Sequence, residues 1–193
     1  MSENKNEKKI STKRLVLLGV LAALVAAGSA IRITMPISIA GTTSFHLGNI
    51  LCALSGILLG PWGGALAAGM GSAIYDMFNP LYISEAWITF LLKGALGLVA
   101  GLIAWTGNKR GTDFKRNILS AAGGALTYAA LYLGKSYFYN ARLVQGLEVE
   151  AALATIVAKL PATGFNAAVS IIFAPILASA IQKALARSHQ TLE

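Results

Sequence analysis

Long apolar runs follow one another through most of this chain, with only short polar stretches between them. Several approach the roughly 20 residues that a helix needs to cross about 30 Å of hydrocarbon. Apolar residues make up 55% of the 193 residues and charged residues only 12%, whereas a soluble domain has about 25% charged residues. The sequence therefore predicts an all-α polytopic membrane protein that forms a single domain.

We expect six transmembrane helices, because Gly, Pro and polar residues divide the apolar runs into six segments. The predicted segments are residues 12–34, 45–59, 62–78, 87–105, 117–139 and 161–185. The break at Gly60 and Pro61 predicts a tight turn between the second and third helices. Both are short for a full span, so a tilted or re-entrant pair is an alternative. Residues 35–44 are predicted to form a loop, and residues 148–160 a short amphipathic helix.

Basic residues gather on one side of the six predicted helices. Eleven of the 16 lie at that side, namely Lys5, Lys8, Lys9, Lys13, Arg14, Lys109, Arg110, Lys115, Arg116, Lys183 and Arg187. Cytoplasmic segments carry such an excess, so we expect both termini in the cytoplasm. The six-helix domain would cover residues 12–188, with a basic tail at 1–11 and a short tail at 189–193.

This orientation brings polar residues from several helices to one layer in the outer half of the membrane. The predicted site residues are Asp76, Glu85, Lys93, Lys135, Asn166, Tyr75, Tyr139, Trp87, His46, Asn49 and Asn79. Ionisable groups inside a bilayer are costly unless they are paired or face water, so such a layer indicates a substrate pocket. We expect Asp76, Lys93 and Lys135, together with Glu85 and Asn166, to bind the polar edge of a ring.

Aromatic residues of the same layer would lie against the face of that ring. Tyr75, Tyr139 or Trp87 are the candidates. Each residue has a simpler alternative role. Asp76 would form a structural ion pair with a lysine, His46 would only end a loop, and Trp87 would belong to the interfacial aromatic belt.

Several functional classes lack their motifs in this chain. There is no P-loop sequence for ATP and no metalloprotease or serine-hydrolase motif. The single Cys52 excludes a disulfide within the chain, and one Cys with two His argues against a metal site. The net charge is +8, but the basic residues cluster just outside the apolar runs, where they set membrane topology. This distribution argues against nucleic acid as a partner. We expect neither a metal nor a cofactor.

Small residues recur at helical spacing in the first predicted helix. They are Ala22, Ala23, Ala26, Ala27 and Ala30. Residues of this size four positions apart let two helix backbones approach closely. We expect them to form a docking surface for another membrane protein, with packing inside the bundle as the alternative.

Residues 45–93 combine HLGN, the Gly-Pro break, a Gly-rich helix and YDMFNP. Together with the alanine motif and the outward-facing polar layer, they resemble the substrate-binding S component of energy-coupling factor (ECF) transporters. The resemblance begins at about Arg14 and covers nearly the whole chain. It is to the branch associated with riboflavin, hydroxymethylpyrimidine and pyridoxine.

This resemblance implies a vitamin-uptake subunit of a bacterial plasma membrane rather than an enzyme. Such a subunit binds a scarce vitamin from outside and docks through its first helix on a transmembrane coupling subunit carried by two ATPases. It is thought to topple in the membrane and so deliver the ligand inward. A pyridoxine-like or hydroxymethylpyrimidine-like ligand is favoured, and riboflavin or cobalamin is the alternative.

Two other functions remain open from the sequence. One is a small transporter or channel that works alone, although the six short segments show no evident inverted repeat. The other is a membrane-embedded enzyme that uses Asp76, Glu85 and His46 as acid and base.

Overall fold

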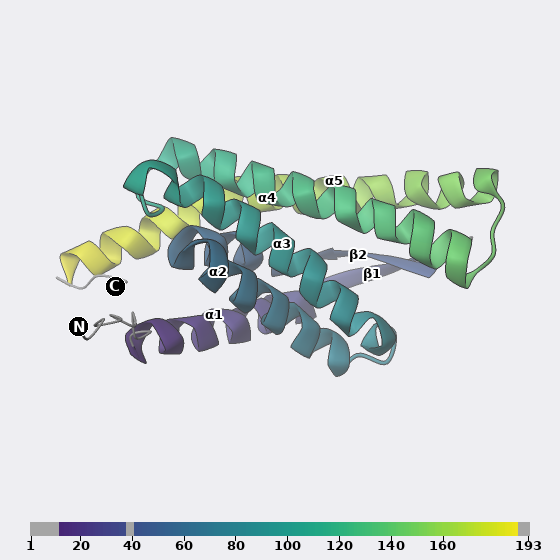
Figure 1. Ribbon diagram of the computed structural model, residues 1–193, viewed down its shortest axis with the longest axis horizontal. Coiled ribbons are helices and arrows are strands. Elements are labelled where there is room, and N and C mark those ends of the chain that lie inside the picture. The colour runs from purple at the N-terminus through teal and green to yellow at the C-terminus, as the bar shows by residue number, and fades with distance from the viewer. Residues whose placement is uncertain (1–11, 38–40, 189–193) are drawn as a thin grey trace, which may run out of the picture.

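The described part of the chain contains five α-helices and one β-hairpin (Figure 1), together with two short 3-10 turns and a π-helix. The computed structural model describes residues 12–37 and 41–188, so the tails predicted at 1–11 and 189–193 lie outside the described residues. The elements are α1 (Thr12–Ala30), β1 (Arg32–Ile37), β2 (Gly41–His46), α2 (Gly48–Met77), α3 (Ala86–Trp105), α4 (Phe114–Lys135) and α5 (Val149–Arg187). Helix α2 supplies most of the buried core and packs against α1, α3 and α5.

The Gly60-Pro61 break turns α2 back on itself, which confirms the predicted turn. Gly60 has a φ of 78°, a left-handed conformation that favours glycine. Beyond the turn, the two arms of α2 touch through their backbones, because a Cβ added to Gly64 would lie 2.4 Å from the Cα of Gly56. The segments predicted as separate helices at 45–59 and 62–78 are therefore the two arms of α2.

Helix α3 packs against this turn through a second pair of glycines. A Cβ on Gly97 would lie 2.3 Å from the carbonyl oxygen of Gly64, and one on Gly101 would lie 2.4 Å from the carbonyl carbon of Gly60. The two glycines are four positions apart and face the same neighbour. Such a pair allows backbones to approach closely in a membrane.

The loop predicted at residues 35–44 is wrong, because the chain forms an antiparallel β-hairpin there. Arg32 pairs with His46 at its base, and Thr34 pairs with Ser44 further along. Strand formation suits the β-branched residues of this segment. Pairing also satisfies backbone N–H and C=O groups that a loop at membrane depth would leave unpaired. Helix α1 consequently ends at Ala30 rather than at residue 34.

The C-terminal third of the sequence also differs from its predicted form. Helix α4 ends at Lys135 and continues as a π-helix, Ser136–Val144. The predicted amphipathic segment 148–160 and the predicted helix 161–185 form one continuous helix, α5. Pro161 lies inside α5 and does not mark the start of a helix, whereas Pro175 lies inside a helix as predicted. Helices tolerate proline in membranes because neighbouring groups satisfy the freed backbone carbonyl.

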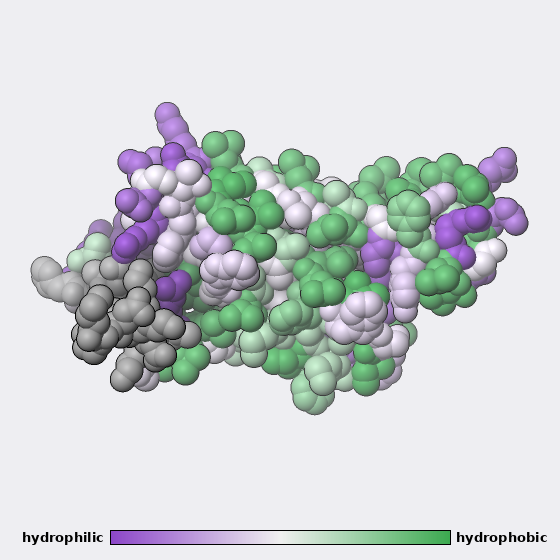
Figure 2. Space-filling model, viewed as in Figure 1, coloured by the Kyte–Doolittle hydropathy of each residue, from purple (hydrophilic) through white to green (hydrophobic). Residues whose placement is uncertain are grey.

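The two ends of the molecule are polar and a broad apolar surface lies between them (Figure 2). The start of α1, the end of α5 and the 106–113 loop lie together at one end (Figure 1). In this loop Asp113 caps α4 by accepting a hydrogen bond from the N–H of Arg116 (3.2 Å), which holds the pKa of its carboxyl below the usual value. The hairpin, the 78–85 loop and the π-helix lie toward the opposite end.

Four helical segments of the described chain are long and apolar enough to cross a membrane. They are α1, α2, the segment 83–108 that contains α3, and α5. These helices support an all-α membrane protein with several spans. Six spans and the cytoplasmic position of the termini remain predictions.

The glycine contact between the arms of α2 leads to a test of stability. We expect Gly64→Ala to destabilise the fold by about 1–3 kcal/mol, because the added methyl group has no space between Gly56 and α3. Gly164→Ala is the matched control, since Gly164 also lies within a helix and has open space around it. Thermal unfolding in detergent measures both, and equal midpoints for the two variants would contradict the packing described.

Candidate functional site

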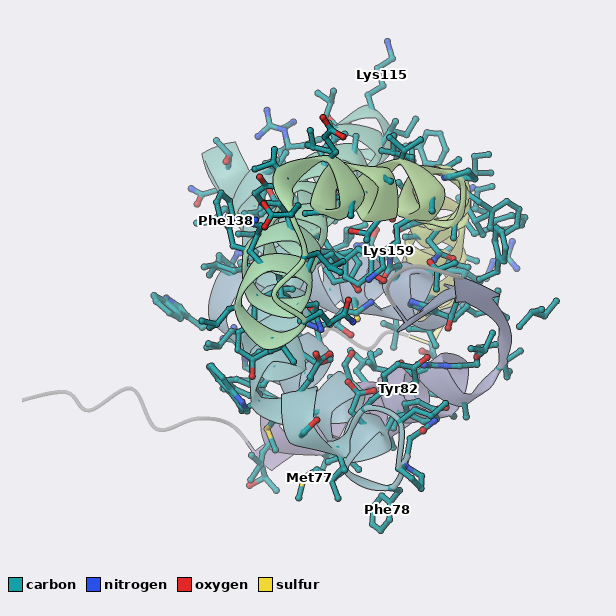
Figure 3. The ribbon with its side chains drawn as sticks, turned by 90° about the vertical axis from the view of Figure 1, so that its right-hand side faces the viewer. Met77, Phe78, Tyr82, Lys115, Phe138 and Lys159 are labelled. Atoms are coloured by element: carbon teal, nitrogen blue, oxygen red, sulfur yellow. The ribbon has the colours of Figure 1, made fainter. Side chains whose placement is uncertain are left out.

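A polar cavity of about 230 Å³ lies between α2, α3, α4, α5 and the hairpin. It is near the end of the molecule opposite the start of α1. Figure 3 looks at the molecule from that end and shows Tyr82 and Lys159 pointing inward, whereas Met77, Phe78 and Phe138 point outward. The cavity is therefore the place where polar side chains from distant parts of the sequence meet.

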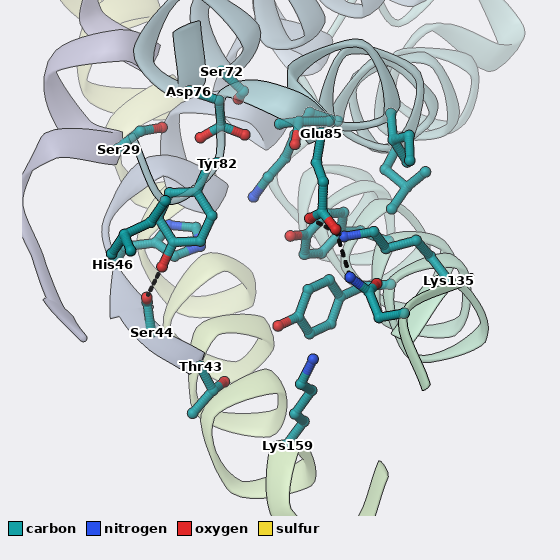
Figure 4. A pocket seen from close by; sticks show the side chains of 18 of the residues that line it. Ser29, Thr43, Ser44, His46, Ser72, Asp76, Tyr82, Glu85, Lys135 and Lys159 are labelled. Carbon is teal, nitrogen blue, oxygen red and sulfur yellow. Dashed lines mark hydrogen bonds and ion pairs between the residues drawn. The ribbon is translucent and has the colours of Figure 1, made fainter. Parts of the chain in front are cut away.

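Glu85 joins two walls of the cavity. Its carboxylate forms an ion pair with Lys135 at the end of α4 and accepts a second hydrogen bond from the side-chain amide of Asn140. Both contacts are drawn in Figure 4. Glu85 ends the 3-10 turn Ile83–Glu85, and Asn140 lies in the π-helix. These bonds hold the 78–85 loop against the segment that follows α4.

Lys93 enters the cavity from α3 and is almost fully buried, with 4% of its surface exposed. Its ammonium group donates to the side-chain oxygen of Asn49 and lies 3.9 Å from the centre of the Tyr128 ring. Asn49 itself is held by Ser170, whose hydroxyl donates to its backbone oxygen at 3.1 Å. Contacts to α2 and α4 thus compensate part of the cost of burying this charge.

Helix α5 contributes a polar stripe to the opposite wall. Lys159, Thr163, Asn166 and Ser170 are all buried and occur three or four positions apart, which places them on one face of the helix. The ammonium group of Lys159 lies 3.2 Å from the hydroxyl of Ser136 and 5.5 Å from the centre of the Tyr132 ring. This face turns toward the cavity.

The β-hairpin closes the remaining side and is tied to α5. Asn166 accepts a hydrogen bond from the N–H of His46 at 3.0 Å and donates one to the carbonyl oxygen of Ser44 at 2.7 Å. The hydroxyls of Ser44 and Tyr82 lie 3.3 Å apart (Figure 4). The hairpin is thereby attached both to the polar face of α5 and to the 78–85 loop.

Arg32 lies beside two tyrosines at the base of the hairpin. Its guanidinium group is 4.3 Å from the centre of the Tyr75 ring and 4.9 Å from that of Tyr82, and it donates to the carbonyl oxygen of Ser29. An Arg in this position presents positive charge to the cavity while aromatic faces support it.

Six of the eleven predicted site residues line the cavity. They are His46, Asp76, Glu85, Lys93, Lys135 and Asn166. The alternative role of Asp76, a structural ion pair with a lysine, is not observed, because Lys135 pairs with Glu85. Asp76 is 6% exposed, and no ion pair is present for it among the described residues.

The other five predicted residues do not line the cavity. Asn49 and Tyr75 lie just behind it, since they contact Lys93 and Arg32. Asn79 donates a hydrogen bond to the hydroxyl of Tyr75 at 2.9 Å. Trp87 is 61% exposed and so does not stack on anything inside the bundle. Tyr139 lies in the π-helix and is not among the residues that line the cavity.

The sequence reasoning missed several lining residues, among them Arg32, Tyr82, Tyr128, Tyr132 and Lys159. The missed residues on α4 and α5 belong to stripes that can be recognised from their spacing in the sequence. Tyr128, Tyr132 and Lys135 recur four and three positions apart on α4, as Lys159, Thr163 and Asn166 do on α5. The second stripe crosses Pro161, so assigning a helix boundary there concealed it.

Two comparisons with known proteins indicate what this chain is similar to. The family model described as ECF-type riboflavin transporter, S component, matches residues 9–183. A protein of Pyrococcus woesei, described as an uncharacterised protein in gap 3′ region, is 30% identical over 107 residues. That match covers 55% of this chain and 66% of the relative, so it spans just under two thirds of the relative's length. The family consists of transporter subunits rather than enzymes. The chain therefore belongs to the ECF-type riboflavin transporter S component family.

Proposed function

We propose that this chain is the vitamin-binding subunit of an ECF-type importer and that the cavity beside Lys93 holds the ligand. The observation that carries the proposal is the gathering of buried polar side chains from four helices and the hairpin around one cavity. Ionisable groups placed this way inside a membrane protein are functional candidates. The cavity lies at the end opposite the basic segments, which the positive-inside rule assigns to the cytoplasm, so it would receive its ligand from outside.

The size and lining of the cavity favour a single-ring vitamin. Its volume of about 230 Å³ lies below the roughly 300–1,000 Å³ of sites for drug-sized ligands. Tyr82, Tyr128 and Tyr132 offer aromatic surface, and the charged groups offer partners for ring substituents. These features suit pyridoxine or hydroxymethylpyrimidine better than the three-ring flavin for which the family is named. Cobalamin is far too large for a cavity of this volume.

Helix α1 is the proposed docking surface for the transmembrane coupling subunit, which two ATPases would drive. The structure divides the alanine motif between two faces. Ala22 is buried against α2, since a Cβ on Gly71 would lie 2.2 Å from its carbonyl oxygen. Ala23, Ala27 and Ala30 are exposed, so they form the small-residue row available to a partner helix.

Ligand binding by the purified protein tests the proposed function directly. We expect tight binding of pyridoxine or hydroxymethylpyrimidine in isothermal titration calorimetry, without chemical conversion of the ligand. Native mass spectrometry of the purified protein would also show a co-purified small molecule. Absence of binding for these compounds, for one-ring vitamins that carry a carboxylate or phosphate group, and for riboflavin would contradict the proposal. Transport by the chain alone in liposomes would also contradict it.

Substitutions in the cavity test its place in binding. Lys93→Ala and Asp76→Ala should each weaken vitamin binding by about 10- to 100-fold, because each removes a charged partner from a water-poor site. Trp87→Ala is the control on the outer surface of α3 and should leave affinity unchanged. The cavity assignment is wrong if the control variant loses affinity while both cavity variants keep it.

The docking surface can be tested separately, because a change on α1 should affect uptake by the complex but not vitamin binding by the isolated subunit. Ala27→Leu should reduce ATP-dependent uptake in the reconstituted complex about tenfold or more, since the larger side chain holds the partner helix away. Vitamin binding by the isolated subunit should not change. Ala130→Leu, at another exposed alanine on α4, is the matched control for bulk in the membrane. Equal uptake by the two variants would argue against docking through α1.

A further inference from the structure

The charges that line the cavity do not balance. Four basic side chains face it, from Arg32, Lys93, Lys135 and Lys159, but only two carboxylates, from Asp76 and Glu85. His46, the other titratable residue of the hairpin wall, adds no negative charge. Positive charge in excess of carboxylates is expensive in a site that is shielded from water. An anionic group on the ligand would compensate it.

The position of each carboxylate shows where the excess lies. Glu85 is already paired with Lys135. Asp76 approaches the cavity from α2, beside the contact between Tyr75 and Arg32. Figure 4 shows Asp76 and Lys159 reaching the cavity from opposite sides. The wall formed by α5 therefore carries a cation without a carboxylate beside it.

Lys159 is a buried cation whose side chain is held in place by its neighbours. Only 5% of its surface is exposed. Its partners are neutral, namely the hydroxyl of Ser136 at 3.2 Å and the face of Tyr132. Within the described part of the chain, no carboxylate lies within 4.0 Å of its ammonium group. Nearby hydroxyl groups of Thr43 and Thr163 also line the cavity.

We propose that Lys159, with the hydroxyl groups of Thr43 and Thr163 beside it, forms an anion subsite, and that the ligand is a one-ring compound carrying a carboxylate or phosphate group. The inference rests on the proposed function and changes its favoured ligand, from neutral pyridoxine or hydroxymethylpyrimidine to a one-ring vitamin with an anionic group. The anionic group would lie against α5 and the π-helix, between Lys159 and the hydroxyl groups beside it. The ring would lie toward Tyr128 and Lys93, and Asp76 would accept hydrogen bonds from the far edge of the ring. A charge-assisted bond in this environment is stronger than one between neutral groups.

Pairs of compounds that differ in charge test this inference. Pyridoxine is compared with pyridoxine 5′-phosphate, and nicotinamide with nicotinate, by calorimetry on the purified full-length protein. The anionic member of at least one pair should bind about tenfold more tightly or better. The two pairs also distinguish a phosphate from a carboxylate. If the neutral member of each pair binds as tightly as the anionic one, the anion subsite is wrong and the proposed function stands.

Variants of Lys159 test whether this residue causes the preference for the anionic compound. Lys159→Gln keeps a donor for Ser136 and removes the charge, so it should weaken anion binding by about 10- to 100-fold and change binding of the neutral compound little. Lys159→Arg should retain the preference. Arg142→Gln removes a positive charge from the same end of the molecule, outside the cavity, and is the matched control.

Each remaining outcome decides between the two proposals. Equal loss of the anionic and neutral compounds in Lys159→Gln would show a general contact and overturn the anion subsite. The same conclusion follows if Arg142→Gln abolishes the preference as fully as Lys159→Gln does, because the effect would then be one of overall charge. If no member of either pair binds the wild-type protein, and riboflavin does not bind either, the proposed function fails together with this inference.

Discussion

Backbone contact between α2 and α3 is the constraint on which the rest of the structure depends. Inside a membrane, lipid is as apolar as a leucine side chain, so helices associate through close packing and hydrogen bonds. Here Gly56 and Gly64 bring the arms of α2 together, and Gly97 and Gly101 bring α3 onto them. This packing sets the distance between the helix that carries Asp76 and the helix that carries Lys93. The cavity lies beyond the contact at Gly60 and Gly101, toward the end of the molecule that carries the hairpin (Figure 1).

Polar groups around the cavity satisfy one another only in part. Glu85 binds both Lys135 and Asn140, and Asn166 forms hydrogen bonds with two backbone groups of the hairpin. The buried side-chain oxygen of Asn140 has no hydrogen-bond partner, although nearly all buried polar groups in proteins have one. Such incomplete pairing is typical of a binding site, where a ligand supplies the missing partners.

The class of protein and much of the cavity can be predicted from the sequence, because hydropathy, glycine spacing and the cost of buried charge act locally. His46, Asp76, Lys93 and Asn166 reach the cavity for this reason. The hairpin and the continuous α5 could not be predicted in the same way. Strand pairing depends on a partner segment, and the helix through Pro161 depends on neighbours that satisfy its backbone. Trp87 does not line the cavity, and its exposed position suits the alternative role in the interfacial aromatic belt.

The central claim is that the cavity beside Lys93 and Lys159 holds the ligand. An experimental structure of the purified protein with its co-purified or added vitamin tests this most directly. The account predicts ligand density enclosed by α3, α4, α5 and the hairpin, in contact with side chains of these two lysines. Density for a bound ligand at another surface, with this cavity empty, would contradict it.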